Sequence, residues 1–242
     1  MNHNIIFLIL TILLFGCKKT AERICFKGNG EALTIDIENE KIFNEIELFD
    51  DINLILINDS LNFTSITGPV NLIEFVELNV ENNLLSIRNL NKCDFLRSEK
   101  EINIHFHYTN LNKVNLSGYG NLSNYDTLKH NIIINANNAY SNINLTINSD
   151  SVQVYLLKGS TSLSLAGFCN SLYGYNSGIA PFNASLLTSK KVHINSNSIA
   201  RTDIIVIENL NAEIRSYGDI YYSGSPLTTN FSITGEGKII QL

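Results

Sequence analysis

The stretch that decides the fold reads Asn115-Leu116-Ser117-Gly118-Tyr119-Gly120-Asn121-Leu122: a short strand, a turn of small residues and another short strand. Weaker copies of this pattern follow at residues 138–143, 165–172, 215–220 and 234–239. The first two copies are 21 residues apart, and the last two are 19 apart. A spacing of about 20 residues suits one coil of a β-solenoid, in which short strands are joined by tight turns.

Stacking explains why such a pattern would repeat. One coil cannot bury its own apolar side chains, whereas a neighbouring coil covers them and pairs the backbone along the solenoid axis. Small residues at the corners let successive coils approach to about 4.8 Å. Between residues 130 and 210 the Ser-Gly pair is replaced by Asn138-Ala139, Ala166-Gly167 and residues 195–197. We therefore expect irregular coils there, and an ordinary sandwich of short strands is the alternative fold.

Before the repeat, apolar and polar residues alternate at period two, which indicates half-buried strands. This alternation is found at residues 45–49, 52–57 and 84–87. It is cleanest at residues 102–108, where the four apolar side chains face one way and the three polar side chains face the other. The one helical turn that we expect lies near residues 71–75.

Composition excludes some classes of function. The chain has 242 residues, of which 44% are hydrophobic and 17% charged, with a net charge of −6 and no Trp. We expect no nucleic-acid partner, because a phosphate backbone requires a basic face. Asn is abundant, with 35 residues. It favours turns, and its side chains form ladders where strands repeat in register. Codon bias in an AT-rich genome is the alternative cause of this excess.

The amino-terminal segment predicts export and lipid attachment. Residues 5–15 form an apolar run interrupted only by Thr11. The run is long enough for the core of a signal peptide and too short to cross a bilayer as a helix. It leads into Leu14-Phe15-Gly16-Cys17, which resembles the bacterial lipobox, whose cysteine receives a diacylglyceryl group. The segment before the run departs from the usual pattern because it has no Lys or Arg, and an uncleaved anchor is the alternative.

These features predict a plan for the whole chain. Residues 1–16 are the signal peptide, 17–27 are a lipidated tether, and 28–242 form a single β-solenoid domain. Within that domain we expect an irregular first part at 28–110 and a repeat part at 111–242.

The predicted lipid anchor at Cys17 determines the location and leaves three other cysteines. Two or three acyl chains would hold the protein stably in a membrane. No Asp follows Cys17, which favours the outer membrane and leaves its periplasmic and cell-surface faces open. Of the remaining Cys25, Cys93 and Cys169, at most one pair can form a disulfide, and Cys25–Cys93 is the candidate pair.

The chain resembles the head GIN domain family of putative auto-transporter adhesins. The segments that carry the resemblance span most of the predicted domain. They are residues 28–30 with 43–54, residues 68–87, and the small-residue turns at 116–122, 219–226 and 234–242. The resemblance implies a right-handed parallel β-helix or β-solenoid on an exported lipoprotein. It implies no demonstrated activity, and it assigns no functional residues.

Two groups of side chains have metal-ligand chemistry. His105 and His107 lie two residues apart on one face of a predicted strand, as in some Zn²⁺ or Cu²⁺ sites, but no third ligand is near in sequence. The second group is the densest acidic stretch, with the oxygen ligands that calcium prefers. It comprises Glu45, Glu47, Asp50, Asp51, Asn53 and Asp59, without a Gly-centred D-x-D loop. We therefore predict no metal and no cofactor, and expect solvated polar residues instead.

Charged pairs and tyrosines are the other candidates in the repeat part. Arg201 with Asp203 and Glu213 with Arg215 are pairs two residues apart, which would form a charge ladder if they lay on neighbouring coils. The recurring tyrosines would provide a stacking surface for sugars or a protein, although packing of the rings at coil corners is the favoured interpretation. They are Tyr119, Tyr140, Tyr155, Tyr173, Tyr175, Tyr217, Tyr221 and Tyr222.

The chain has no nucleotide-binding loop, no G-x-S-x-G and no H-E-x-x-H motif. Its charges after residue 110 are too sparse for the converging carboxylates of a glycoside-cleaving groove. We therefore predict no catalytic residues, and a non-enzymatic envelope lipoprotein whose β-solenoid presents a surface for adhesion or for binding a protein or glycan partner. The alternatives are a β-helix carbohydrate-active enzyme, either a polysaccharide lyase or a hydrolase, and a periplasmic structural or sensing component.

Replacing the predicted lipid attachment site tests the anchor. We expect Cys17→Ala to yield a soluble protein or an unprocessed precursor, because no thiol remains to accept the diacylglyceryl group. Membrane fractionation and the intact mass of the protein measure this outcome. A variant with the parent's membrane fraction and mature mass would contradict the prediction.

Overall fold

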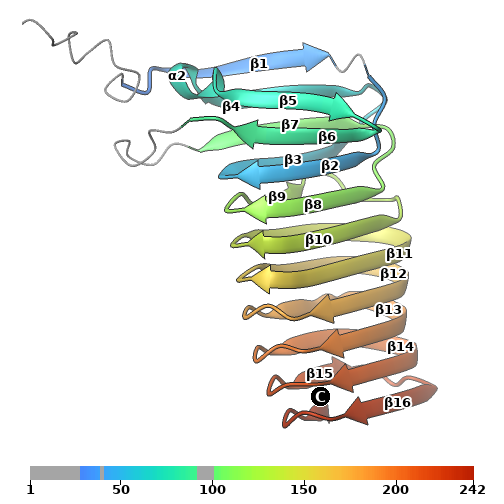
Figure 1. The fold of residues 1–242 in the computed structure, drawn as a ribbon. Coiled ribbons are helices and arrows are strands. Elements are labelled where there is room, and N and C mark those ends of the chain that lie inside the picture. The colour runs from blue at the N-terminus through green and yellow to red at the C-terminus, as the bar shows by residue number, and fades with distance from the viewer. Residues whose placement is uncertain (1–27, 39–40, 92–100) are drawn as a thin grey trace, which may run out of the picture.

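The computed structural model describes residues 28–38, 41–91 and 101–242, and these form an all-β protein containing a β-solenoid of about six turns (Figure 1). The solenoid and the parallel strands predicted from the repeat are therefore confirmed. Within the described ranges, no helix is long and apolar enough to span a membrane.

The first part of the domain contains seven strands and one helical turn. The strands are β1 (Ala32–Glu38), β2 (Glu45–Asp50), β3 (Ile52–Asn58), β4 (Phe63–Pro69), β5 (Val76–Glu81), β6 (Leu84–Asn89) and β7 (Ile102–Tyr108). The helical turn is α2 (Val70–Ile73), close to its predicted position. Three pairs here are antiparallel, namely β1–β4, β4–β7 and β5–β6. They lie at one end of the stack, above the parallel coils (Figure 1).

The repeat part continues as ten strands that pair in parallel. They are β8 (Lys113–Gly118), β9 (Leu122–Asn124), β10 (Ile132–Ala139), β11 (Asn142–Gly159), β12 (Ser162–Asn176), β13 (Phe182–Ser196), β14 (Thr202–Ile214), β15 (Ile220–Ser223), β16 (Thr228–Ile233) and β17 (Ile239–Gln241).

Each coil of the repeat part has two legs. The start of β11 pairs with β9 and its end pairs with β10, while the start of β14 pairs with β15 and its end with β16. We call the strands in line with β9 and β15 the first leg, and those in line with β10 and β16 the second leg. The two legs form the two layers seen in Figure 1, and their inward side chains join one hydrophobic core.

The middle coils keep a 20-residue repeat at many positions, and the irregularity expected over 130–210 is present as register shifts, for example between Ser164 and Ala166 and between Ala184 and Thr188. On the first leg Ile143 pairs with Leu163, and on the second leg Val152 pairs with Leu172. Both pairs are 20 residues apart, although the Ser-Gly signal is lost in this region. What stacking requires is an apolar inward side chain at each equivalent position, and that requirement is met without the Ser-Gly pair.

Glycines allow close approach where one coil crosses the next. A Cβ on Gly120 would lie 1.8 Å from the carbonyl oxygen of Ile52, and a Cβ on Gly118 would lie 2.3 Å from that of Asp50. Gly118 also has a φ of +131°, which L side chains rarely adopt. The Ser-Gly-Tyr-Gly turn is therefore needed at the junction between β8 and the first part of the domain.

We expect Gly120→Ala to lower the free energy of unfolding by about 1–3 kcal/mol or more, because the added methyl group forces the backbone of Ile52 to move. Gly28→Ala is the matched control, since no atom lies within 4 Å of the position that its Cβ would take. Urea unfolding followed by circular dichroism measures both. Equal stability of the two variants would contradict the close packing of these coils.

Candidate functional site

The outward side chains of the second leg form a continuous polar and aromatic surface, which we call the second-leg face. Strand pairing places one residue from each coil in a single row along the solenoid axis. The row consists of Glu47, Asn115, Asn135, Tyr155, Tyr175, Asn195, Glu213 and Ser232. Each residue in the row therefore lies about 4.8 Å from the equivalent residues on neighbouring coils.

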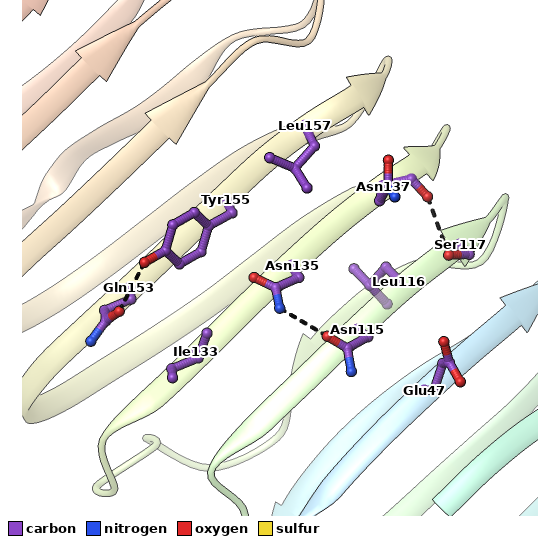
Figure 2. A pocket seen from close by; sticks show the side chains of 10 residues that line it. All are labelled: Glu47, Asn115, Leu116, Ser117, Ile133, Asn135, Asn137, Gln153, Tyr155 and Leu157. Atoms are coloured by element: carbon purple, nitrogen blue, oxygen red, sulfur yellow. Dashed lines mark hydrogen bonds between the residues drawn. The ribbon is translucent and has the colours of Figure 1, made fainter. Parts of the chain in front are cut away.

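A hollow of about 530 Å³ lies on this face, where β2, β8, β10 and β11 run side by side (Figure 2). Seven of its ten lining residues are polar, with a single carboxylate and no Lys, Arg or His. The lining residues are Glu47, Asn115, Leu116, Ser117, Ile133, Asn135, Asn137, Gln153, Tyr155 and Leu157. Asn135 Nδ2 donates to Asn115 Oδ1 at 2.9 Å, and the Tyr155 hydroxyl donates to Gln153 Oε1 at 3.1 Å.

A series of contacting, mutually tilted aromatic rings begins at the edge of the hollow. The ring centroids of Tyr155 and Tyr173 are 5.3 Å apart, and those of Tyr173 and His193 are also 5.3 Å apart. These distances are typical of favourable ring pairs. Beyond Tyr155 the ring contacts end, because the next coils carry Asn135 and Asn115 in the equivalent row.

A second, smaller hollow of about 250 Å³ lies further along the same face, beside His193, Asn211, Glu213 and Asn230. The Glu213 carboxylate accepts a 2.8 Å hydrogen bond from Arg215 Nε. This hydrogen bond lowers the pKa of Glu213, so the group is a carboxylate at neutral pH. The opposite first-leg face has a third hollow, of about 370 Å³, lined by short polar residues such as Asn144, Ser164 and Asn183.

Asparagine ladders cross the coils, as the sequence predicted. Asn53 Nδ2 donates to Asn103 Oδ1 at 3.1 Å, and Asn53 Oδ1 accepts from both the backbone and the side chain of Asn121 at 3.0 Å. Asn121 Oδ1 in turn accepts from Asn142 at 2.9 and 3.1 Å. Some of the Asn excess thus stabilises the stacking of coils.

His105 and His107, the two histidines considered as candidate metal ligands, have different surroundings. His107 Nδ1 lies 2.9 Å from Asp59 Oδ2, and its ring stacks on Phe63 with centroids 3.8 Å apart. The hydrogen bond to His107 lowers the pKa of the Asp59 carboxyl, assisted by hydrogen bonds from Ser60. His105 lies between Ile55 and Ser65 in the sheet. Nowhere in the described residues do three or more His, Cys, Asp or Glu side chains form a metal-binding group.

The acidic stretch does not converge on one point either. Asp50 and Asp51 accept hydrogen bonds from Asn89, at 3.0 Å from its backbone and 2.9 Å from its side chain. Glu45 pairs with Lys113 Nζ at 3.1 Å. Asp59 binds His107, while Asn53 belongs to the asparagine ladder.

The two predicted charged pairs form, but the charge ladder between neighbouring coils does not. Arg201 donates to Asp203 at 2.7 and 2.9 Å, and Arg215 donates to Glu213. The pairs lie at opposite ends of a single strand, β14, and therefore on different legs of one coil. The Arg201 guanidinium also lies 3.8 Å from the ring centroid of Tyr221, which fixes it over that ring.

The tyrosines differ in burial and in the rings that they contact. Tyr222 is buried, whereas Tyr119, Tyr140 and Tyr217 are more than half exposed. Tyr119 and Tyr140 stack on each other at a corner, with centroids 5.5 Å apart. Packing at corners thus accounts for part of the set, while Tyr155, Tyr173 and Tyr175 lie on the second-leg face. Their grouping with Asn135 and Gln153 was not apparent in the sequence, although the 20-residue offset between Tyr155 and Tyr175 was a usable signal.

Three of the four cysteines, Cys17, Cys25 and Cys93, lie outside the described residues, and so do the signal peptide and the tether. The predicted anchor and the candidate disulfide therefore remain predictions. Cys169 is buried and free, and its Sγ lies 3.3 Å from Ser189 Oγ. Burial raises the pKa of the Cys169 thiol, which makes it an inert core residue.

The chain matches the model of a family described as "Putative auto-transporter adhesin, head GIN domain" over residues 42–226. Its fold is similar to that of a putative adhesin from Bacteroides fragilis, with a TM-score of 0.76 and 21% identity over 88% of this chain and 97% of that one. A putative adhesin from Parabacteroides merdae has a TM-score of 0.63 and 20% identity, covering 89% and 98% of the two chains.

A putative lipid binding protein from Parabacteroides distasonis is also similar, with a TM-score of 0.56 and 18% identity over 89% of this chain and 98% of that one. At these identities the likeness shows a shared fold alone. No curated protein matches this chain significantly.

The asparagine ladder gives a direct test of the coil contacts. We expect Asn53→Ala to cost about 1–3 kcal/mol of unfolding free energy, because it removes the acceptor of two hydrogen bonds from Asn121. Asn144→Ala is the control, since this exposed residue lies on the same leg and should change stability by less than about 0.5 kcal/mol. Equal effects of the two substitutions in thermal and urea unfolding would show that the ladder contributes nothing.

Proposed function

Because the chain belongs to the head GIN domain family, we propose that it is a non-enzymatic envelope lipoprotein whose β-solenoid presents a binding surface for adhesion. The observation that carries this proposal is the second-leg face, a row of amide and aromatic side chains repeated along the axis. A stacked-coil scaffold positions such a row rigidly, and extended solenoid surfaces are well suited to binding long partners.

The anchor is the second element of the proposal. Acylation at Cys17 would attach the protein to the outer membrane, and the tether would connect the membrane to the β1 end of the domain. The last coil, with β16 and β17, lies at the opposite end of the stack (Figure 1). The second-leg face would then extend away from the membrane, where a partner can reach it.

The composition of the hollow supports binding over catalysis. A glycoside-cleaving site places two carboxylic groups on either side of the scissile bond, and a lyase needs a base and a charge-neutralising cation. The lining of the main hollow contains Glu47 as its sole carboxylate and no cation. The charged groups Arg201, Asp203, Glu213 and Arg215 neutralise one another in pairs at the two ends of β14.

Protease treatment of intact cells tests surface display. We expect external protease to remove the protein from whole cells, because the proposed function needs the domain outside the outer membrane. A periplasmic protein made by the same cells serves as the integrity control. Survival of the protein until the cells are lysed would favour the structural or sensing role in the periplasm.

A binding assay then tests adhesion itself. Cells producing the parent protein should bind immobilised glycans or envelope proteins more strongly than cells producing Cys17→Ala. Binding that is equal for the two cell types, with equal amounts of protein made, would contradict the proposal.

A further inference from the structure

We infer that the hollow beside Tyr155 is a subsite for one pyranose ring of a neutral glycan that lies along the solenoid axis. This inference rests on the proposed function and specifies the chemical class of the partner. It depends on three properties of the second-leg face: its shape, its hydrogen-bonding groups and its charge.

The shape of the hollow results from a change of residue type along one row of paired positions. Tyr175 and Tyr155 occupy the same row on successive coils, and Asn135 and Asn115 continue that row. An amide is much shorter than a phenol ring, so the row of tyrosines stops at Tyr155 and a space opens over Asn135 (Figure 2). The ring of Tyr155 packs against Tyr173 on one side and borders this space on the other. A flat, ring-shaped ligand placed there would contact the ring of Tyr155 and continue the series of ring contacts.

A pyranose ring suits this position because it has both an apolar and a polar character. Its C–H face can stack on an aromatic ring, and its hydroxyl groups both donate and accept hydrogen bonds. The floor of the hollow offers partners of both kinds. In the described residues, no hydrogen bond engages Asn115 Nδ2, Gln153 Nε2, Asn135 Oδ1 or the Glu47 carboxylate.

The charge of the hollow selects the class of glycan. Glu47 is its one formal charge, and the nearby Lys113 is paired with Glu45. Lys158, in register with Asn137, has no ion pair in the described residues, but it lies outside the lining of the hollow. A ligand in the hollow therefore meets the negative charge of Glu47, which repels sulfated, phosphorylated or uronic-acid chains. The hollow combines seven polar residues with the half-buried apolar side chains of Ile133 and Leu157, and this mixture suits a sugar better than an acyl chain.

The continuation of the face indicates an oligosaccharide and not a single sugar. His193, the last ring in the series of ring contacts, lines the second hollow, where Asn211 and Glu213 supply further polar groups. His193 lies two coils from Gln153, a separation of about 10 Å at the usual spacing of strands. A chain of several sugars along the axis would reach from the first hollow to the second.

The experiment measures binding of the mature lipoprotein, purified in detergent, to cellopentaose, chitopentaose, mannopentaose and a heparin pentasaccharide by calorimetry. We expect at least one neutral oligosaccharide to bind and the heparin fragment not to bind. Tyr155→Ala should weaken binding at least about tenfold by removing the stacking platform. Asn135→Tyr should weaken it equally, because a ring at this position continues the row and fills the hollow. Tyr140→Ala is the matched control, since it removes a stacked, exposed tyrosine at a corner outside the hollow.

Each outcome has a distinct meaning. Neutral glycan binding that survives both Tyr155→Ala and Asn135→Tyr would overturn the location of the subsite and leave the proposed function intact. Binding of heparin alone, or of none of the four probes, would overturn the inferred class of ligand. The whole-cell assays described above then decide separately whether the protein is an adhesin. Circular dichroism of each variant establishes that lost binding does not reflect lost folding.

Discussion

Stacking of one coil on the next is the interaction on which the whole molecule depends. A coil of about 20 residues has two short legs and no interior of its own, so its apolar side chains are covered only when another coil lies above and below. The parallel ladders of β11, β12, β13 and β14 provide that cover, and residues such as Ile143, Val152 and Leu163 become fully buried between them. Pairing the backbone of one coil with that of the next therefore also buries the apolar side chains between them.

The same constraint shapes the outside of the molecule. Any outward side chain has an equivalent on the next coil at the spacing of a β-sheet. Neighbouring side chains therefore form hydrogen bonds, pack against each other or leave a gap. Asn53 hydrogen-bonds to both Asn103 and Asn121. The rings of Tyr155 and Tyr173 pack against each other at a tilt. Where Asn135 follows Tyr155 in the row, a hollow results. A candidate binding site thus arises from a single change of residue type within a regular array.

The ends of the stack differ from its middle because one side of each terminal strand has no neighbouring coil. At the first end, antiparallel strands replace parallel coils, and β1 exposes Leu33, Ile35 and Ile37. At the other end the inward positions of β16, including Phe231 and Ile233, are about half exposed. Edge strands of this kind are usually shielded by charged residues or by additional structure.

From the sequence alone, the period of the repeat determined a solenoid, and alternation determined the buried side of strands such as β3 and β7. These features are local, since inward and outward positions follow from the pleat of a strand. Only the tertiary structure decided which outward side chains meet, such as the group of Asn115, Asn135, Gln153 and Tyr155. It also decided the register of the middle coils and the position of both charged pairs at the ends of one strand. The physical reason is register: a shift of one coil relative to the next by a few residues would leave every local pattern unchanged and yet bring different side chains together.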